Sequence, residues 1–263
     1  MTGAPVALHH AIDGEETEAP TLLLAGSLGS TLATWEPQVA PLARRRRLVR
    51  LDLRGHGRSP EPPGPYAIAD LGRDVLALLD ELAIERTDWC GLSLGGMVGM
   101  WLAANAPARI GRLVLLCTSA HMPPAEDWRR RAAAVRAAGA VDAVADAVVA
   151  RWLTPAFAAA EPALRDRLRA MLAASPPDGY AACCEAIAAM DLREQLPRIA
   201  APTLIVAGAE DLAAPPAHAE RIAAAIPGAR LRTLSPMAHL GNVEQPGAVT
   251  RLILDHLDRP EAP

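Results

Sequence analysis

Short apolar runs that alternate with longer segments of helical spacing constrain the fold of this 263-residue chain more than any other feature. Such alternation is typical of βαβ units around a mostly parallel sheet, whose strands are covered on both faces. The predicted strands are Thr21 to Ala25, Arg47 to Leu51, Thr87 to Gly91, Leu113 to Cys117, Pro202 to Ala207 and Arg230 to Leu234. The predicted helices are at about Ile68 to Leu82, Leu94 to Asn105, Pro216 to Ala225 and Pro246 to Leu257. The fold class is therefore expected to be α/β, with helices on both faces of the sheet.

The segment 121–196 differs in character from the rest of the chain. Ala, Arg, Asp and Glu dominate it, apolar residues recur at helical intervals, and prolines divide it into short helices. We expect an all-helical cap inserted between two sheet strands, with residues 1–120 and 197–263 forming the core. Such a cap should cover the carboxyl edge of the sheet, where ligands bind in open α/β folds.

Composition excludes several classes of partner. The net charge is −4 and the sequence contains no lysine, so neither favours binding to a nucleic acid backbone. The basic run Arg44 to Arg47 is expected to be a solvated corner between a helix and a strand. No apolar run approaches the roughly 20 residues needed to span a bilayer, and the amino terminus lacks a secretion signal. These features predict a cytoplasmic protein without a membrane partner.

The four cysteines lack the spacing of zinc ligands, and two of them lie inside apolar strand-like runs where cysteine behaves as a small hydrophobe. We expect all of them to be reduced, and we predict neither a metal nor a cofactor. The four are Cys90, Cys117, Cys183 and Cys184.

The motif G-x-S-x-G occupies residues 91–95, with a predicted strand before it and a predicted helix after it. In that context a tight turn would project Ser93 above the sheet as a nucleophile. Gly91, Gly95 and Gly96 would remove collisions at the turn. The competing interpretation is that Ser93 only caps the following helix.

A serine hydroxyl needs a histidine to take its proton and a carboxylate to orient that histidine. Asp211 follows the strand that ends near Ala207, and His239 follows the strand that ends near Leu234. Glu210 is an alternative to Asp211. His56 is the competitor of His239, although its turn favours a loop role. The order Ser, Asp, His and the topology both favour Ser93, Asp211 and His239.

Ester hydrolysis also requires donors aimed at the developing oxyanion. The backbone N–H of Leu94, the first in the helix after Ser93, is one candidate. The second should come from the loop after the strand at 21–25, where we favour the N–H of Leu28 over that of Ser27. The alternative is that this loop is only a glycine-rich turn.

These residues resemble the α/β-hydrolase superfamily over nearly the whole chain. The segment RLVRLDLRGHGRS (47–59) is similar to its D-x-R-G-x-G-x-S signature, in which Asp52 and Arg54 would pin a loop. Within the superfamily, six segments are similar to the 3-oxoadipate enol-lactonases of the β-ketoadipate pathway of aromatic catabolism. They are SLGSTLATWEPQ, GPYAIADLGRDVLALLDEL, GLSLGGMVGMWLA, RWLTPAF, GYAACCEAIAAMDLR and AHLGNVEQP.

The resemblance implies opening of a small carboxylate-bearing enol-lactone to 3-oxoadipate, without a cofactor. It also implies a substrate site in the cap, with Arg131 binding the carboxylate, Trp128 and Trp152 forming an apolar wall and Tyr180 nearby. Arg131 could instead be solvated, and Trp152 could be plain cap core. The competing functions are a general esterase or perhydrolase of the same fold and a non-catalytic ligand receptor.

Two positions depart from the family pattern. Gly26 stands where many superfamily members have histidine, and Leu153 stands where these lactonases more often have an aromatic residue. Neither departure affects Ser93, Asp211 or His239, so both concern the choice of substrate and leave the chemistry unchanged.

Overall fold

The computed structural model describes residues 3–260, and its centre is a seven-stranded sheet of order β1-β3-β2-β4-β5-β6-β7. Only β1 runs antiparallel to its neighbour in this sheet, and the other paired strands are parallel. The strands are β1 (His10–Asp13), β2 (Leu22–Ala25), β3 (Leu48–Leu51), β4 (Thr87–Leu92), β5 (Ile110–Leu116), β6 (Thr203–Gly208) and β7 (Arg230–Leu234). The α/β class is confirmed.

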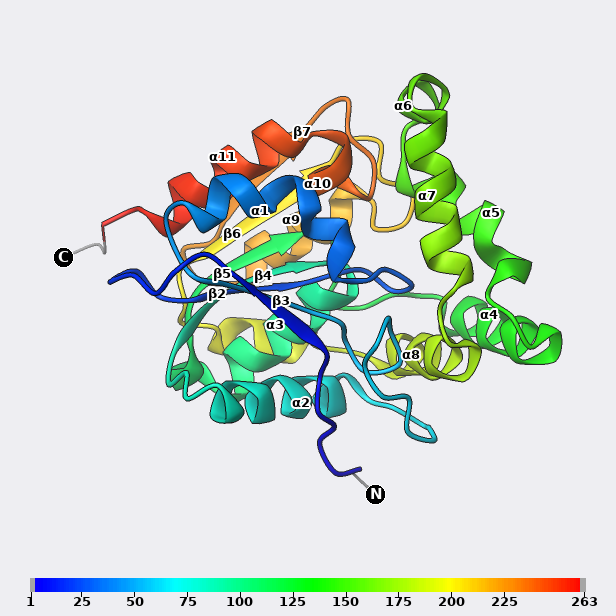
Figure 1. Ribbon diagram of the computed structural model, residues 1–263, viewed down its shortest axis with the longest axis horizontal. Helices are drawn as coiled ribbons and strands as arrows, with labels where there is room; N and C mark the ends of the chain where they lie inside the picture. Colours follow the sequence, from blue (N-terminus) through cyan, green and yellow to red (C-terminus); the bar gives the residue numbers. More distant parts are fainter. Residues whose placement is uncertain (1–2, 261–263) are drawn as a thin grey trace.

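Helices cover the sheet on both sides, with α1 and α11 on one face and α2 and α3 on the other (Figure 1). Helix α3 is buried along nearly its whole length, and it begins directly behind the central strand β4. The core helices are α1 (Glu36–Ala43), α2 (Ile68–Glu81), α3 (Leu94–Asn105), α9 (Pro216–Ala225), α10 (Gly241–Glu244) and α11 (Pro246–Leu257). Short 3-10 turns are η1 (Leu32–Trp35), η2 (Pro107–Arg109) and η3 (Arg193–Arg198).

The chain between β5 and β6 forms helices that lie together at one end of the sheet (Figure 1). They are α4 (Ala125–Ala138), α5 (Asp142–Trp152), α6 (Pro155–Ala160), α7 (Pro162–Ala173) and α8 (Pro177–Ala189). An isolated antiparallel bridge joins His121 to Asp191, so the chain leaves and re-enters the sheet region at neighbouring points. We refer to α4–α8 as the cap, and its limits at 121 and 196 remain our proposal.

The basic run at 44–47 is a solvated corner only in part, because Arg44 and Arg45 are exposed and Arg46 is not. Arg46 is only 2% exposed, and its Nη1 lies 3.1 Å from Asp88 Oδ2. Its Nη2 lies 2.6 Å from Asp258 Oδ1. Burial raises the pKa of Asp88 to about 6, and the Arg46 charge opposes that rise. The run therefore supplies an internal cation that joins the helix before β3 to the carboxyl-terminal helix.

Two further observations concern the chain as a whole. The four cysteines are free and buried, as expected. Within residues 3–260, no helix combines the length and the apolar character required to cross a bilayer.

Candidate active site

Ser93 stands at the turn between β4 and α3 in a strained backbone conformation. Its φ is 53° and its ψ is −110°, a combination that costs a non-glycine residue on the order of 1–3 kcal/mol. The turn is held from several sides: the Ser93 N–H donates to Leu116 O at 2.9 Å, and its carbonyl accepts from Thr118 Oγ1 at 2.6 Å. The surrounding strands thus enforce a conformation that lifts the hydroxyl away from the helix axis.

Two glycines allow this turn to close. A Cβ on Gly95 would lie 2.3 Å from the carbonyl oxygen of Ala25, and one on Gly91 would lie 2.2 Å from the carbonyl oxygen of Gly95. The indole Nε1 of Trp89 donates to that same Gly95 oxygen at 3.0 Å. The motif glycines are therefore required by backbone contact, which a serine that only capped a helix would not need.

His239 and Asp211 meet at the ends of β7 and β6. His239 Nδ1 lies 2.9 Å from Asp211 Oδ2, and both side chains are buried. Asp211 Oδ1 accepts from the N–H groups of Ala213 and Ala214, each at 2.8 Å. Because the carboxylate only accepts, His239 carries its proton on Nδ1 and leaves Nε2 as a lone pair. This arrangement suits a base that takes a proton from a hydroxyl.

The two alternatives raised by the sequence lie elsewhere. Glu210 accepts from Ser235 Oγ at 2.8 Å and from the Met237 N–H at 2.7 Å, so it supports the loop that leads to His239. His56 is buried, with Nδ1 3.1 Å from the carbonyl oxygen of Arg54. The contacts of Glu210 and His56 therefore fit a role in supporting loops.

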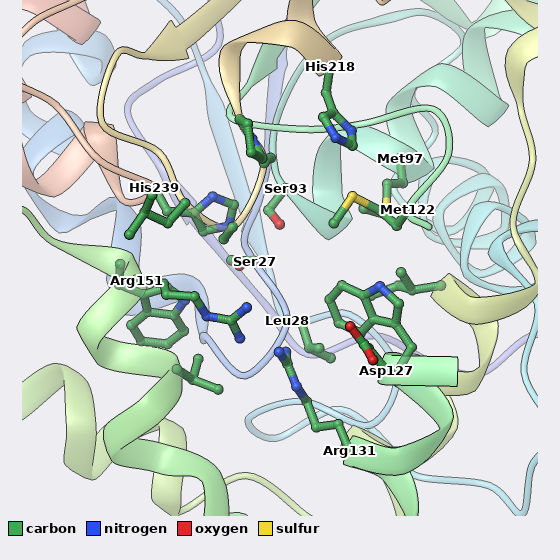
Figure 2. A pocket seen from close by; sticks show the side chains of 18 of the residues that line it. Ser27, Leu28, Ser93, Met97, Met122, Asp127, Arg131, Arg151, His218 and His239 are labelled. Atoms are coloured by element: carbon green, nitrogen blue, oxygen red, sulfur yellow. The ribbon is translucent and has the colours of Figure 1, made fainter. Parts of the chain in front are cut away.

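Ser93 and His239 line one cavity of about 300 Å³ between the sheet and the cap (Figure 2). The same cavity is lined by the residues that the sequence singled out in the β2 loop and the cap, namely Ser27, Leu28, Trp128, Arg131, Trp152 and Tyr180. Trp152 and Tyr180 are also buried, so each is both cap core and cavity wall.

The candidate oxyanion donors come from two loops held against each other. The Gly95 N–H donates to Gly26 O at 2.9 Å, which places the loop after β2 beside the turn at Ser93. The loop then bends at Gly29, where φ is 78°. Leu94 is the first residue of α3, so its N–H has no carbonyl one turn earlier. Within residues 3–260 no hydrogen bond to the Leu28 N–H is found. The assignment of these donors stays a prediction.

Sequence reasoning did not propose several residues that line the cavity, among them two with basic side chains. Arg151, in the last turn of α5, and His218, in the first turn of α9, both line the cavity. His218 Nδ1 lies 2.6 Å from Ser119 Oγ, and burial, followed by the charge of Arg221, lowers the pKa of His218. Arg151 adjoins Trp152 in the segment RWLTPAF, a signal that could have identified it.

The cap is hydrogen-bonded to the loop that carries His239. The Leu240 N–H donates to Trp152 O at 2.8 Å. Glu244 accepts from the Ala238 N–H at 2.8 Å and, through its other oxygen, from the Thr154 N–H at 3.2 Å. One carboxylate of α10 thus fixes both the start of α6 and the residue before His239.

Comparison with known proteins identifies the family of this chain and several similar hydrolases. The family model described as alpha/beta hydrolase fold matches residues 20–246. The chain is 38% identical to 3-oxoadipate enol-lactonase 2 of Acinetobacter baylyi, over 96% of this chain and 94% of that protein. It is 43% identical to the enol-lactonase from Burkholderia xenovorans LB400, with a TM-score of 0.93 and 96% of each chain covered. A hydrolase from Pseudomonas aeruginosa PA01 is 47% identical, with a TM-score of 0.92 over 96% of this chain and 94% of that one.

Proposed function

This chain belongs to the alpha/beta hydrolase fold family and is a carboxylic-ester hydrolase, and we propose that its reaction is the opening of 3-oxoadipate enol-lactone to 3-oxoadipate. The observation that carries the proposal is the 38% identity to a named enol-lactonase over nearly the whole chain. It covers 96% of the chain, so it includes the cap helices that form one wall of the cavity.

Ser93 attacks the lactone carbonyl while His239 Nε2 takes the hydroxyl proton. Asp211 stabilises the imidazolium and holds the ring in the tautomer described above. Collapse of the tetrahedral intermediate breaks the ring C–O bond, and the leaving oxygen takes the proton from His239. The released enol becomes a ketone, which makes this oxygen a good leaving group.

The ring-opened chain remains attached to Ser93 as an ester. A water molecule, deprotonated by His239, attacks that ester and releases the second carboxylate. The N–H groups of Leu28 and Leu94 would stabilise the oxyanion in both steps, each contributing on the order of 10² to 10³ in rate. The substrate's own carboxylate would be bound by Arg131, with Trp128 and Trp152 against the apolar part of the ring.

The test is loss of enol-lactone absorbance with wild type and with Ser93→Ala. We expect a fall in kcat/KM of at least about 10³-fold, because only oxyanion stabilisation and binding survive. The far-UV circular dichroism of the variant should match that of wild type.

A parallel assay with p-nitrophenyl acetate tests the choice of substrate. Comparable or higher kcat/KM on this simple ester than on the enol-lactone would contradict the lactonase proposal and favour a general esterase. Failure of a serine-directed phosphonate to label Ser93 would instead favour a ligand receptor.

A further inference from the structure

Two arginines of the cap project into the cavity without a carboxylate partner. Arg131 comes from α4 and Arg151 from α5, and Figure 2 shows their guanidinium groups pointing toward each other across the cavity from Ser93. Within residues 3–260 neither forms an ion pair, whereas Arg129, Arg130 and Arg136, the exposed arginines of α4 that do not line the cavity, all do. The exposed arginines of α4 are thus paired with carboxylates, whereas the two arginines at the cavity are not.

The acids near these arginines are engaged elsewhere. Asp127 lines the cavity but is exposed and pairs with Arg130. Asp211 is bonded to His239 and to two backbone N–H groups. Burial, and then the charge of Arg131, lowers the pKa of Arg151. The chain therefore holds two like charges close together in a partly desolvated place, an arrangement that is costly without a bound anion.

A third donor points to the same place. The hydroxyl of Tyr180, on α8, is completely buried beside Arg131, and its hydrogen has no acceptor within residues 3–260. Its residue lines the cavity, and the positive charges of Arg131 and Arg151 act on it, opposing the rise in its pKa that burial causes. A phenol beside cations can donate its hydrogen only to an acceptor that the protein does not supply there.

We propose that Arg131, Arg151 and Tyr180 together form an anion subsite that binds the substrate's carboxylate and selects anionic over neutral esters. Two guanidinium groups have donors and no acceptors, and the phenol adds an O–H, so together they can hold both oxygens of a planar carboxylate. The guanidinium carbon of Arg131 lies over the Trp128 ring, 4.6 Å from its centroid, and this cation–π contact helps to position the charge. This inference rests on the proposed function for the position of the reacting carbonyl at Ser93, and it makes Arg151 a specificity residue.

The subsite is tested with two p-nitrophenyl esters, the monoester of glutarate, which is anionic, and the butyrate ester, which is neutral. The measured quantity is the ratio of their kcat/KM values. Arg151→Met should lower this ratio by about 10- to 100-fold, and Tyr180→Phe by about 3- to 10-fold, because the greater loss falls on the anionic ester. Arg129→Met removes the same charge from the outer surface of α4 and should leave the ratio unchanged.

Thermal unfolding gives a second readout that does not depend on turnover. Without ligand, Arg151→Met should unfold at a higher temperature than wild type, because it removes the repulsion from Arg131. Glutarate should raise the unfolding temperature of wild type and not that of the variant. An unchanged ester ratio in Arg151→Met would overturn the subsite, as would an equal fall on both esters or a lower unfolding temperature without ligand.

The subsite and the lactonase proposal can fail separately. If wild type is inactive on the enol-lactone but Arg151→Met still lowers the ester ratio, the lactonase function is contradicted and the subsite is supported. If wild type opens the lactone but Arg151→Met leaves the ester ratio unchanged, only the subsite is contradicted.

Discussion

The sheet core and the cap use their arginines in opposite ways. In the core, Arg54 is buried against Asp74, with Nε and Nη2 at 2.5 and 2.6 Å from its two carboxylate oxygens. In the cap, Arg136 and Arg169 pair with carboxylates of neighbouring helices near solvent. The cap arginines that line the cavity, Arg131 and Arg151, have no carboxylate partner within residues 3–260. A buried ion pair thus holds a loop of the core, whereas the ion pairs of the cap lie near solvent. Two further cap arginines form the proposed anion subsite.

Breaking the Arg54–Asp74 pair should have the largest effect on stability. Arg54→Met leaves Asp74 buried without its partner, and we expect a loss of about 3–5 kcal/mol in the free energy of unfolding. Urea denaturation at pH 7 measures it. The matched cap variant Arg169→Met removes solvent-exposed pairs and should unfold within error of wild type. Equal effects of the two variants would contradict the contrast between core and cap.

A methyl group at the Ser93 turn should cost somewhat less. Gly95→Ala places a Cβ against the backbone of β2, so the strand and α3 must separate, and we expect a loss of about 3 kcal/mol. Esterase activity should fall as well, because the same shift moves Ser93. Chemical denaturation and p-nitrophenyl acetate turnover check the two effects, and a variant with full stability would show that the turn is looser than described.

Acid should weaken the core through His256, on α11. Its Nε2–H donates to Pro202 O at 3.1 Å and its Nδ1 lies 3.2 Å from Arg230 Nη2, so the ring is neutral. Burial, and then the charge of Arg230, lowers the pKa of His256 from 6.5 to about 4. Neutral His256 therefore contributes stability above pH 6.5 that is lost as pH falls toward 4.

The measurement compares wild type with His256→Gln at pH 7.5 and pH 4.5. The difference in unfolding free energy between the two proteins should change by about 2–3 kcal/mol over this interval, with wild type losing more. Asp88, with a pKa of about 6, acts in the opposite direction, since its contribution is full below pH 3.8 and is lost as pH rises through 6. Both proteins carry Asp88, so the difference between them isolates His256.

The smallest effect is expected in the cap. Gly139 ends α4 with φ at 65°, and a Cβ there would meet no atom within 4 Å. Gly139→Ala should therefore cost only the left-handed backbone strain, about 1 kcal/mol. Urea denaturation compares it with Gly95→Ala, and a larger loss at 139 than at 95 would reverse the ranking of the two regions.

Sequence reasoning located the elements that contain their own signals. The bounds of α3, α9, α11 and β7 agree with the structure, because glycines and prolines mark the ends of their apolar patterns. It missed β1, a short edge strand of mixed polarity that depends on pairing with β3, and α1, whose pattern is interrupted by Pro41. Pairing across the sheet is not encoded locally.

The same limit applies to the site. Ser93, Asp211 and His239 could be nominated because each follows a strand at the same edge of the sheet. His218 could not, since the direction of its side chain depends on how α9 packs against other elements, and Arg151 could be reached only through the family resemblance of its segment. The burial of Arg46 could not be predicted from the sequence either, because its partner Asp258 lies 212 residues away in the chain.

The pairing of His121 with Asp191 brings together the two chain segments that connect the cap to the sheet. Since both crossing segments leave the sheet side by side, α4–α8 can be replaced as one cassette without rerouting any strand. A helical insertion grafted at this junction would need to restore the contacts that Trp152 and Thr154 make with the loop carrying His239. With those contacts kept, the graft would be expected to retain hydrolysis and to change which substrates are accepted.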